Sequence, residues 1–91
     1  MPVSVRIPTQ LRELSGGASE VKLLPGTVAQ VLQQLESEHP GFAERLFDGK
    51  GELRRFVNVF VADEDIRFEQ GLETAVAEGQ TVSIVPAVAG G

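Results

Sequence analysis

The chain has 91 residues, a net charge of −5 and no cysteine, so we expect one domain without disulfides, cysteine-ligated zinc or iron–sulfur clusters. Its single histidine, His39, argues against a multi-histidine metal site and a Ser-His-Asp triad. The eight basic residues are scattered apart from Arg54-Arg55, which argues against nucleic acid as the main ligand.

The first part of the chain predicts two strands followed by one long helix. Alternating apolar residues predict strands over 3–7 and 20–24, joined as a hairpin with a long connection. Thr27 and Gln30 have the spacing of a capping box, so the helix is expected to begin at Thr27 and to stop at His39. Its apolar face is formed by four residues at helical spacing: Val28, Val31, Leu32 and Leu35.

The second part predicts a short helical turn over 42–47 and three more strands. The longest strand is expected within 53–62, a short one over 66–68 and the last over 81–85, where Pro86 ends it because proline lacks an N–H. Period-two alternation divides the middle strand into an inner face of Val57, Val59 and Val61 and an outer face of Phe56, Asn58 and Phe60.

This order of elements predicts a two-layer α+β domain. The first and last strands are both hydrophobic and can pair in parallel at the sheet centre, with the long helix lying across the sheet. That arrangement is the β-grasp, or ubiquitin-like, fold: a mixed sheet of four to five strands packed on one long helix. We expect residues 1–86 to form this domain and residues 87–91 to form a flexible, reactive C-terminal tail. No segment resembles a signal peptide or a membrane span, so a cytoplasmic protein without a membrane partner is expected.

The final residues, Pro86-Ala87-Val88-Ala89-Gly90-Gly91, predict an extended end with an unshielded carboxylate, because glycine has no Cβ. Five extended residues reach at most about 17 Å, enough to thread the carboxylate into the active site of another protein. Such an end can be activated as an acyl-adenylate and then attacked by a sulfur or nitrogen nucleophile. The alternative is a frayed terminus without a function.

Motifs along the whole chain carry a family resemblance. They are Arg55-Phe56-Val57-Asn58, Asp63-Glu64-Asp65 followed by Arg67-Phe68, Gly71-Leu72, and the Pro-Ala-Val-Ala-Gly-Gly end. Together with the strand order, they make the chain resemble the prokaryotic ubiquitin-like sulfur carrier proteins of the MoaD/ThiS type. That group includes the small subunit of molybdopterin synthase and the thiamin-pathway carrier, and the likeness is closest to the CysO-type carrier of cysteine biosynthesis.

The resemblance implies a protein co-substrate rather than an enzyme. An E1-like enzyme would use ATP and Mg²⁺ to adenylate the Gly91 carboxylate, and a sulfur donor would convert it to a thiocarboxylate. A cysteine-synthase-like enzyme would accept the sulfur, and a metalloprotease would release cysteine; the carrier would bind none of these cofactors durably. Sulfur transfer to molybdopterin, thiamin or a secondary metabolite stays open, as does a ubiquitin-like modifier joined to lysines or an interaction domain with an inert tail.

Partner contacts are expected from the tail and from the outer sheet face. The residues concerned are Pro86, Ala87, Val88, Ala89, Gly90, Phe56, Phe60 and Val85. Phe56, Phe60 and Val85 either form an exposed apolar patch for a partner or lie partly under the 42–47 turn as core. The negative net charge indicates either ordinary solubility or steering toward a basic partner surface.

Overall fold

Strands, two α-helices and short 3₁₀ helices alternate along residues 2–86, which are the residues that the computed structural model describes. In chain order the elements are β1 (Val3–Arg6), the 3₁₀ helix η1 (Thr9–Ser15), β2 (Glu20–Leu23), β3 (Gly26–Thr27), α1 (Val28–Glu38), α2 (Phe42–Leu46), β4 (Val57–Val61), β5 (Glu64–Asp65), the 3₁₀ helices η2 (Ile66–Phe68) and η3 (Gly71–Glu73), β6 (Ala75–Val76) and β7 (Thr81–Pro86).

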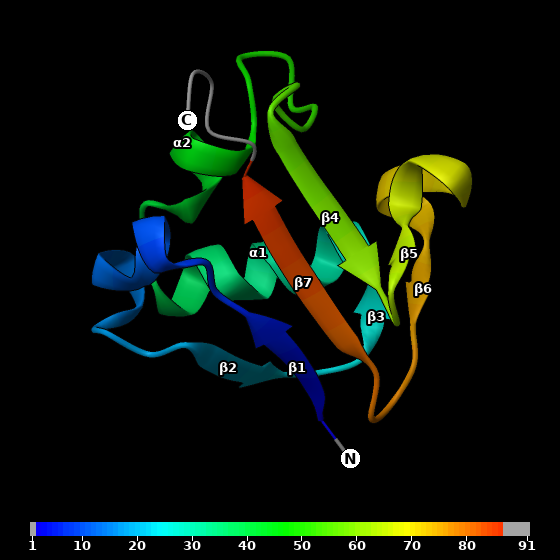
Figure 1. The fold of residues 1–91 in the computed structure, drawn as a ribbon, viewed down its shortest axis with the longest axis horizontal. Helices are drawn as coiled ribbons and strands as arrows, with labels where there is room; N and C mark the ends of the chain where they lie inside the picture. The colour runs from blue at the N-terminus through cyan, green and yellow to red at the C-terminus, as the bar shows by residue number, and fades with distance from the viewer. Residues whose placement is uncertain (1, 87–91) are drawn as a thin grey trace.

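Strands from the two ends of the described chain lie side by side at the centre of a mixed sheet (Figure 1). β1 and β7 are parallel, with Val5 opposite Val82, as the sequence predicts. β2 pairs antiparallel with β1, β4 pairs antiparallel with β7, and β5 extends the far edge, giving the order β2-β1-β7-β4-β5. The predicted β-grasp arrangement is therefore confirmed, with five strands in the sheet and a separate β3–β6 pair.

The long helix α1 crosses one face of this sheet, behind the central strands in Figure 1. Its start is the predicted capping box: the Gln30 N–H donates to Thr27 Oγ1 at 3.2 Å, and the Thr27 N–H donates to Gln30 Oε1 at 2.9 Å. At the other end the His39 N–H donates to the Leu35 carbonyl at 2.8 Å, so the helix ends where the sequence predicts.

A single hydrophobic core fills the space between α1, α2 and the inner face of the sheet. The apolar face of α1 is buried as predicted, and Val57, Val59 and Val61 of β4 face it. On β7, Val82 and Ile84 are buried whereas Val85 is exposed, which also matches the expected alternation. Burial of these side chains supplies the main favourable term for folding.

Two local predictions are wrong, and one element was not predicted. Residues 66–68 form the 3₁₀ helix η2 rather than a strand, because Asp65 Oδ1 accepts from the Arg67 N–H at 2.8 Å and caps a helical turn. β4 starts only at Val57, since its N–H donates back to the Arg54 carbonyl at 3.0 Å, so β7 and not β4 is the longest strand. The connection between the first two strands also contains η1, which was not predicted.

Candidate functional site

The predicted site residues lie only partly within the described structure. Ala87, Val88, Ala89, Gly90 and Gly91 lie outside the described residues 2–86. The described part of the site is therefore the end of β7, from which these residues continue, and the surfaces around it.

β7 ends at Pro86, which is also the last residue that the structure describes. Pro86 lies opposite Val57, the first residue of β4, and Val85 lies opposite Asn58. Proline cannot donate a hydrogen bond, so Pro86 offers a neighbouring strand only its carbonyl. Residue 87 follows directly on this last described residue of the central strand.

Phe56, Phe60 and Val85 form what we call the outer apolar patch. Phe56 is 48% exposed and Val85 is 46% exposed, so neither belongs to the core, while Phe60 is partly buried. Phe60 lies opposite Ser83, which makes it a diagonal neighbour of Val85 on the outer face. The 42–47 segment instead buries its own Phe42 and Leu46, so the exposed interpretation of the patch fits the structure.

Arg67 is a residue of this region that the sequence did not single out for a role. Its Nη1 donates to Asn58 Oδ1 at 2.7 Å, and its Nη2 donates to the carbonyls of Val57 and Arg55 at 3.0 and 3.1 Å. Because Val57 is the residue opposite Pro86, the Arg67 guanidinium holds the strand against which the tail begins.

The position of Arg67 follows from the shortness of β5. That strand covers only Phe60 and Val61, which leaves the beginning of β4 without a neighbouring strand on this side. The guanidinium of Arg67 takes the open carbonyls there, a case of a sheet edge closed by a charged side chain. No spacing in the sequence points to this contact, since it depends on η2 folding back over the edge.

The charged motifs Arg54-Arg55 and Asp63-Glu64-Asp65 lie where they stabilise loops and turns. The Arg54 guanidinium donates to the Glu44 carbonyl at 3.2 Å from Nε and 3.0 Å from Nη2, tying the loop before β4 to α2. Ala62 and Asp63 have φ values of 49° and 71°, the left-handed turn of a tight hairpin between β4 and β5. No group of three metal-ligating side chains occurs among residues 2–86.

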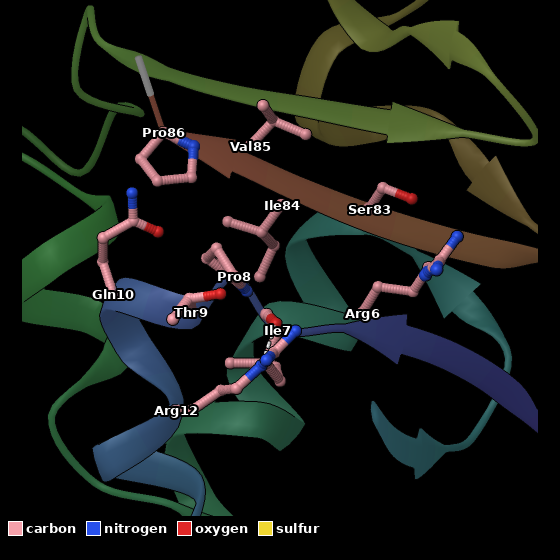
Figure 2. A pocket seen from close by; sticks show the side chains of 10 residues that line it. All are labelled: Arg6, Ile7, Pro8, Thr9, Gln10, Arg12, Ser83, Ile84, Val85 and Pro86. Carbon is pink, nitrogen blue, oxygen red and sulfur yellow. Dashed lines mark hydrogen bonds between the residues drawn. The ribbon is translucent and has the colours of Figure 1, made fainter. Parts of the chain in front are cut away.

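A groove of about 410 Å³ runs beside the end of β7 (Figure 2). One wall is the chain from the end of β1 into η1, and the other is residues 83–86 of β7. Figure 2 shows Pro86 and Gln10 at one end of the lining and Arg6 at the other, with Pro8 between them. The groove thus reaches Pro86, the last residue before the tail.

None of the helices within the described range is long and apolar enough to span a membrane.

The chain is similar in sequence to one protein family and to several known proteins. The ThiS family model matches residues 5–91. The sulfur carrier protein CysO of Mycobacterium tuberculosis is 50% identical over 93 residues, covering 100% of both chains. The small archaeal modifier protein 3 of Haloferax volcanii is 42% identical over 65 residues, covering 71% of this chain and 70% of that protein.

A solved structure shows the same fold. The crystal structure of the Amycolatopsis orientalis BexX/CysO complex contains a chain that superposes with a TM-score of 0.91 at 47% identity, covering 98% of this chain and 99% of that one. The full-length relatives are small carriers rather than enzymes. The chain described here therefore belongs to the ThiS family of ubiquitin-like sulfur carrier proteins.

Proposed function

We propose that the protein carries sulfur as a thiocarboxylate on Gly91 and donates it in cysteine biosynthesis. The observation that carries this proposal is the 50% identity, over the whole chain, to a protein named sulfur carrier protein CysO. The described structure supports it in one further respect: the central strand β7 leads directly to residues 87–91.

The chemistry needs activation of a poor acyl group. In the proposed first step, a Gly91 carboxylate oxygen attacks the α-phosphorus of ATP in an E1-like enzyme, and pyrophosphate leaves. In the second step, a sulfur nucleophile attacks the acyl carbon and AMP leaves, which places sulfur where one oxygen was. The ATP and Mg²⁺ belong to the activating enzyme. The carrier has no cysteine, so its own side chains offer no thiol for a persulfide.

Partner enzymes would hold the body of the carrier while the tail enters their active sites. The solved BexX/CysO complex supports docking of a carrier of this type on a second protein. We assign the outer apolar patch, Phe56, Phe60 and Val85, to that docking, because exposed or partly exposed apolar side chains near Pro86 suit a protein interface. A cysteine-synthase-like sulfur acceptor and a product-releasing metalloprotease complete the proposed set of partners.

The decisive experiment is reconstitution with the E1-like enzyme of the same cell, ATP, Mg²⁺ and a sulfide donor. Intact-mass spectrometry should detect a sulfur-for-oxygen gain on the free chain, and pyrophosphate release should depend on the carrier. Gly90→Ala and Gly91→Ala should keep the thermal unfolding midpoint and lower turnover by about 100-fold or more, because added bulk displaces the acyl carbon from its reactive position. Normal turnover of these variants would contradict the proposal.

Conjugation to lysines is the second candidate, and the identity to small archaeal modifier protein 3 is the observation in its favour. Both functions begin with adenylation, so the products separate them. A carrier gives a thiocarboxylate on the free chain, whereas a modifier gives isopeptide-linked products of higher mass. Mass spectrometry of tagged carrier recovered from cells under denaturing conditions distinguishes the two.

A further inference from the structure

The groove beside the tail has a charge opposite to that of the whole protein. The chain carries a net charge of −5, yet Arg6 and Arg12 line the groove and no aspartate or glutamate does. Its remaining lining is apolar or neutral, including Pro8, Val85 and Pro86. A basic, partly apolar surface on an acidic protein is a local feature that its general solubility does not require.

Arg6 is an exposed residue at the end of β1. It lies in register between Glu20 of β2 and Ser83 of β7. Glu20 Oε1 lies 3.2 Å from Lys22 Nζ, and Glu20 and Arg6 line a neighbouring depression together. Within the described part of the chain, the Arg6 guanidinium has no hydrogen bond or ion pair.

Arg12 is held in place but keeps unused donors. Its Nε donates to the Ile7 carbonyl at 3.1 Å, and its side chain is partly buried on η1 (Figure 2). Between residues 2 and 86, the two terminal nitrogens of this guanidinium make no hydrogen bond. A guanidinium that is already oriented loses less conformational entropy on binding, and its remaining donors suit a carboxylate.

The position of the groove determines which protein meets it. Pro86 forms part of the wall, and five extended residues from Ala87 to Gly91 reach at most about 17 Å. An enzyme that takes the Gly91 carboxylate into its active site must therefore bring its own surface to within that distance of Pro86. This step rests on the function proposed above.

We propose that the groove binds an acidic segment of the adenylating enzyme, whose carboxylates pair with Arg6 and Arg12 while apolar neighbours pack on Pro8 and Val85. This contact shares Val85 with the outer apolar patch but differs from it in chemistry. The patch offers apolar area, whereas the groove offers two charge-assisted, directional contacts that select an acidic partner and speed its association.

The test is charge reversal with a matched control. Arg6→Glu and Arg12→Glu are compared with Arg45→Glu, which changes the net charge equally at an exposed site on α2 that is not in the groove. Pyrophosphate release by the E1-like enzyme is measured against carrier concentration for each full-length variant. Either groove reversal should raise KM for the carrier about tenfold or more and leave kcat within about twofold, with a weaker dependence of KM on salt. Arg45→Glu should leave KM within about twofold.

The outcomes separate this inference from the function on which it rests. If the wild type is adenylated and Arg6→Glu has the same KM as Arg45→Glu, the groove has no such role and the proposed function stands. If the wild-type chain is not adenylated, both proposals fall. Arg12→Glu also removes the bond to Ile7, so thermal unfolding is measured in parallel. If that variant unfolds, Arg6→Glu alone decides the question.

Discussion

The two edges of the five-stranded sheet are closed by side chains of different chemistry. Beyond β2, the side-chain amide of Gln34 accepts from the Leu24 N–H and donates to the Leu24 carbonyl, both at 2.9 Å. Beside β4, the Arg67 guanidinium only donates, to the carbonyls of Val57 and Arg55 and to the Asn58 side chain. The amide replaces both functions of a neighbouring strand, whereas the guanidinium replaces its N–H groups alone.

The difference matters because one contact fixes the helix α1 to β2, whereas the other fixes the start of β4 opposite Pro86. Gln34 belongs to α1, so its contact fastens the helix to the end of β2, which lies level with the start of β7 and away from Pro86. Arg67 holds Val57, which is the residue opposite Pro86. The first contact should therefore serve stability alone, and the second should serve stability and the presentation of the tail.

The largest effect is expected from Arg67→Met, which keeps a long apolar side chain and removes all three hydrogen bonds. The free energy of unfolding should fall by about 2 kcal/mol in urea denaturation, and KM for adenylation should rise. Arg55→Met is the matched control, because that exposed side chain makes no hydrogen bond within residues 2–86. Equal stability of the two variants would refute the role given to Arg67.

A smaller effect is expected from Gln34→Ala, which removes the two bonds to Leu24 and should lower the free energy of unfolding by about 1 kcal/mol. Adenylation kinetics should not change. Gln34→Glu should recover little, because a carboxylate cannot donate to the Leu24 carbonyl. Gln33→Ala, at the exposed neighbouring position on α1, is the control and should be within about 0.5 kcal/mol of wild type. A rise in KM for adenylation of Gln34→Ala would show that both contacts, and not only that of Arg67, affect adenylation.

A still smaller effect is expected from Lys22→Gln on the β2 edge. Lys22 lies 3.2 Å from Glu20 and donates to Ser4 Oγ at 2.6 Å, but both charged side chains are about half exposed. The change in the free energy of unfolding should stay below about 0.5 kcal/mol and shrink further in high salt. Urea titrations at two salt concentrations measure this change in the free energy of unfolding. A loss as large as that of Gln34→Ala would show that the Lys22–Glu20 ion pair stabilises β2 as strongly as the Gln34 hydrogen bonds to Leu24 do.

The smallest effect is the coupling between the edges. Gln34 and Arg67 share no partner and act on strands at opposite sides of the sheet. The double variant Gln34→Ala with Arg67→Met should therefore lose the sum of the single losses to within about 0.5 kcal/mol. A larger coupling energy in the double-mutant cycle would mean that the two edges respond to one another through the central strands.

The sequence predicts those parts of the fold whose causes are local. The capping box of α1 needs only Thr27 and Gln30, and the alternation of valines in β4 follows from the strand period, so both were predicted correctly. The same alternation wrongly predicts a strand at 66–68, which form the 3₁₀ helix η2. A strand would place Ile66 and Phe68 on one face, yet Ile66 is buried and Phe68 is 83% exposed.

The groove and the Arg67 contact depend on segments far apart in the chain. Arg6 and Pro86 come from opposite ends of the sequence, and only the parallel pairing of β1 with β7 brings their strands together. Arg67 reaches Val57 because η2 turns back over the edge that β5 leaves open. Neither contact has a spacing that could reveal it, whereas the inner and outer faces of β4 follow from local alternation alone.

The placement of β7 in the middle of the sheet has a consequence for synthesis. Without residues 81–86, the described strands reduce to the separate β1–β2 and β4–β5 hairpins and the small β3–β6 pair, and isolated hairpins are marginal in water. The nascent polypeptide therefore completes its sheet only after these residues have emerged from the ribosome. Messages cut short before this point yield chains that lack the central strand, so the full sheet forms only together with the strand that leads to residues 87–91.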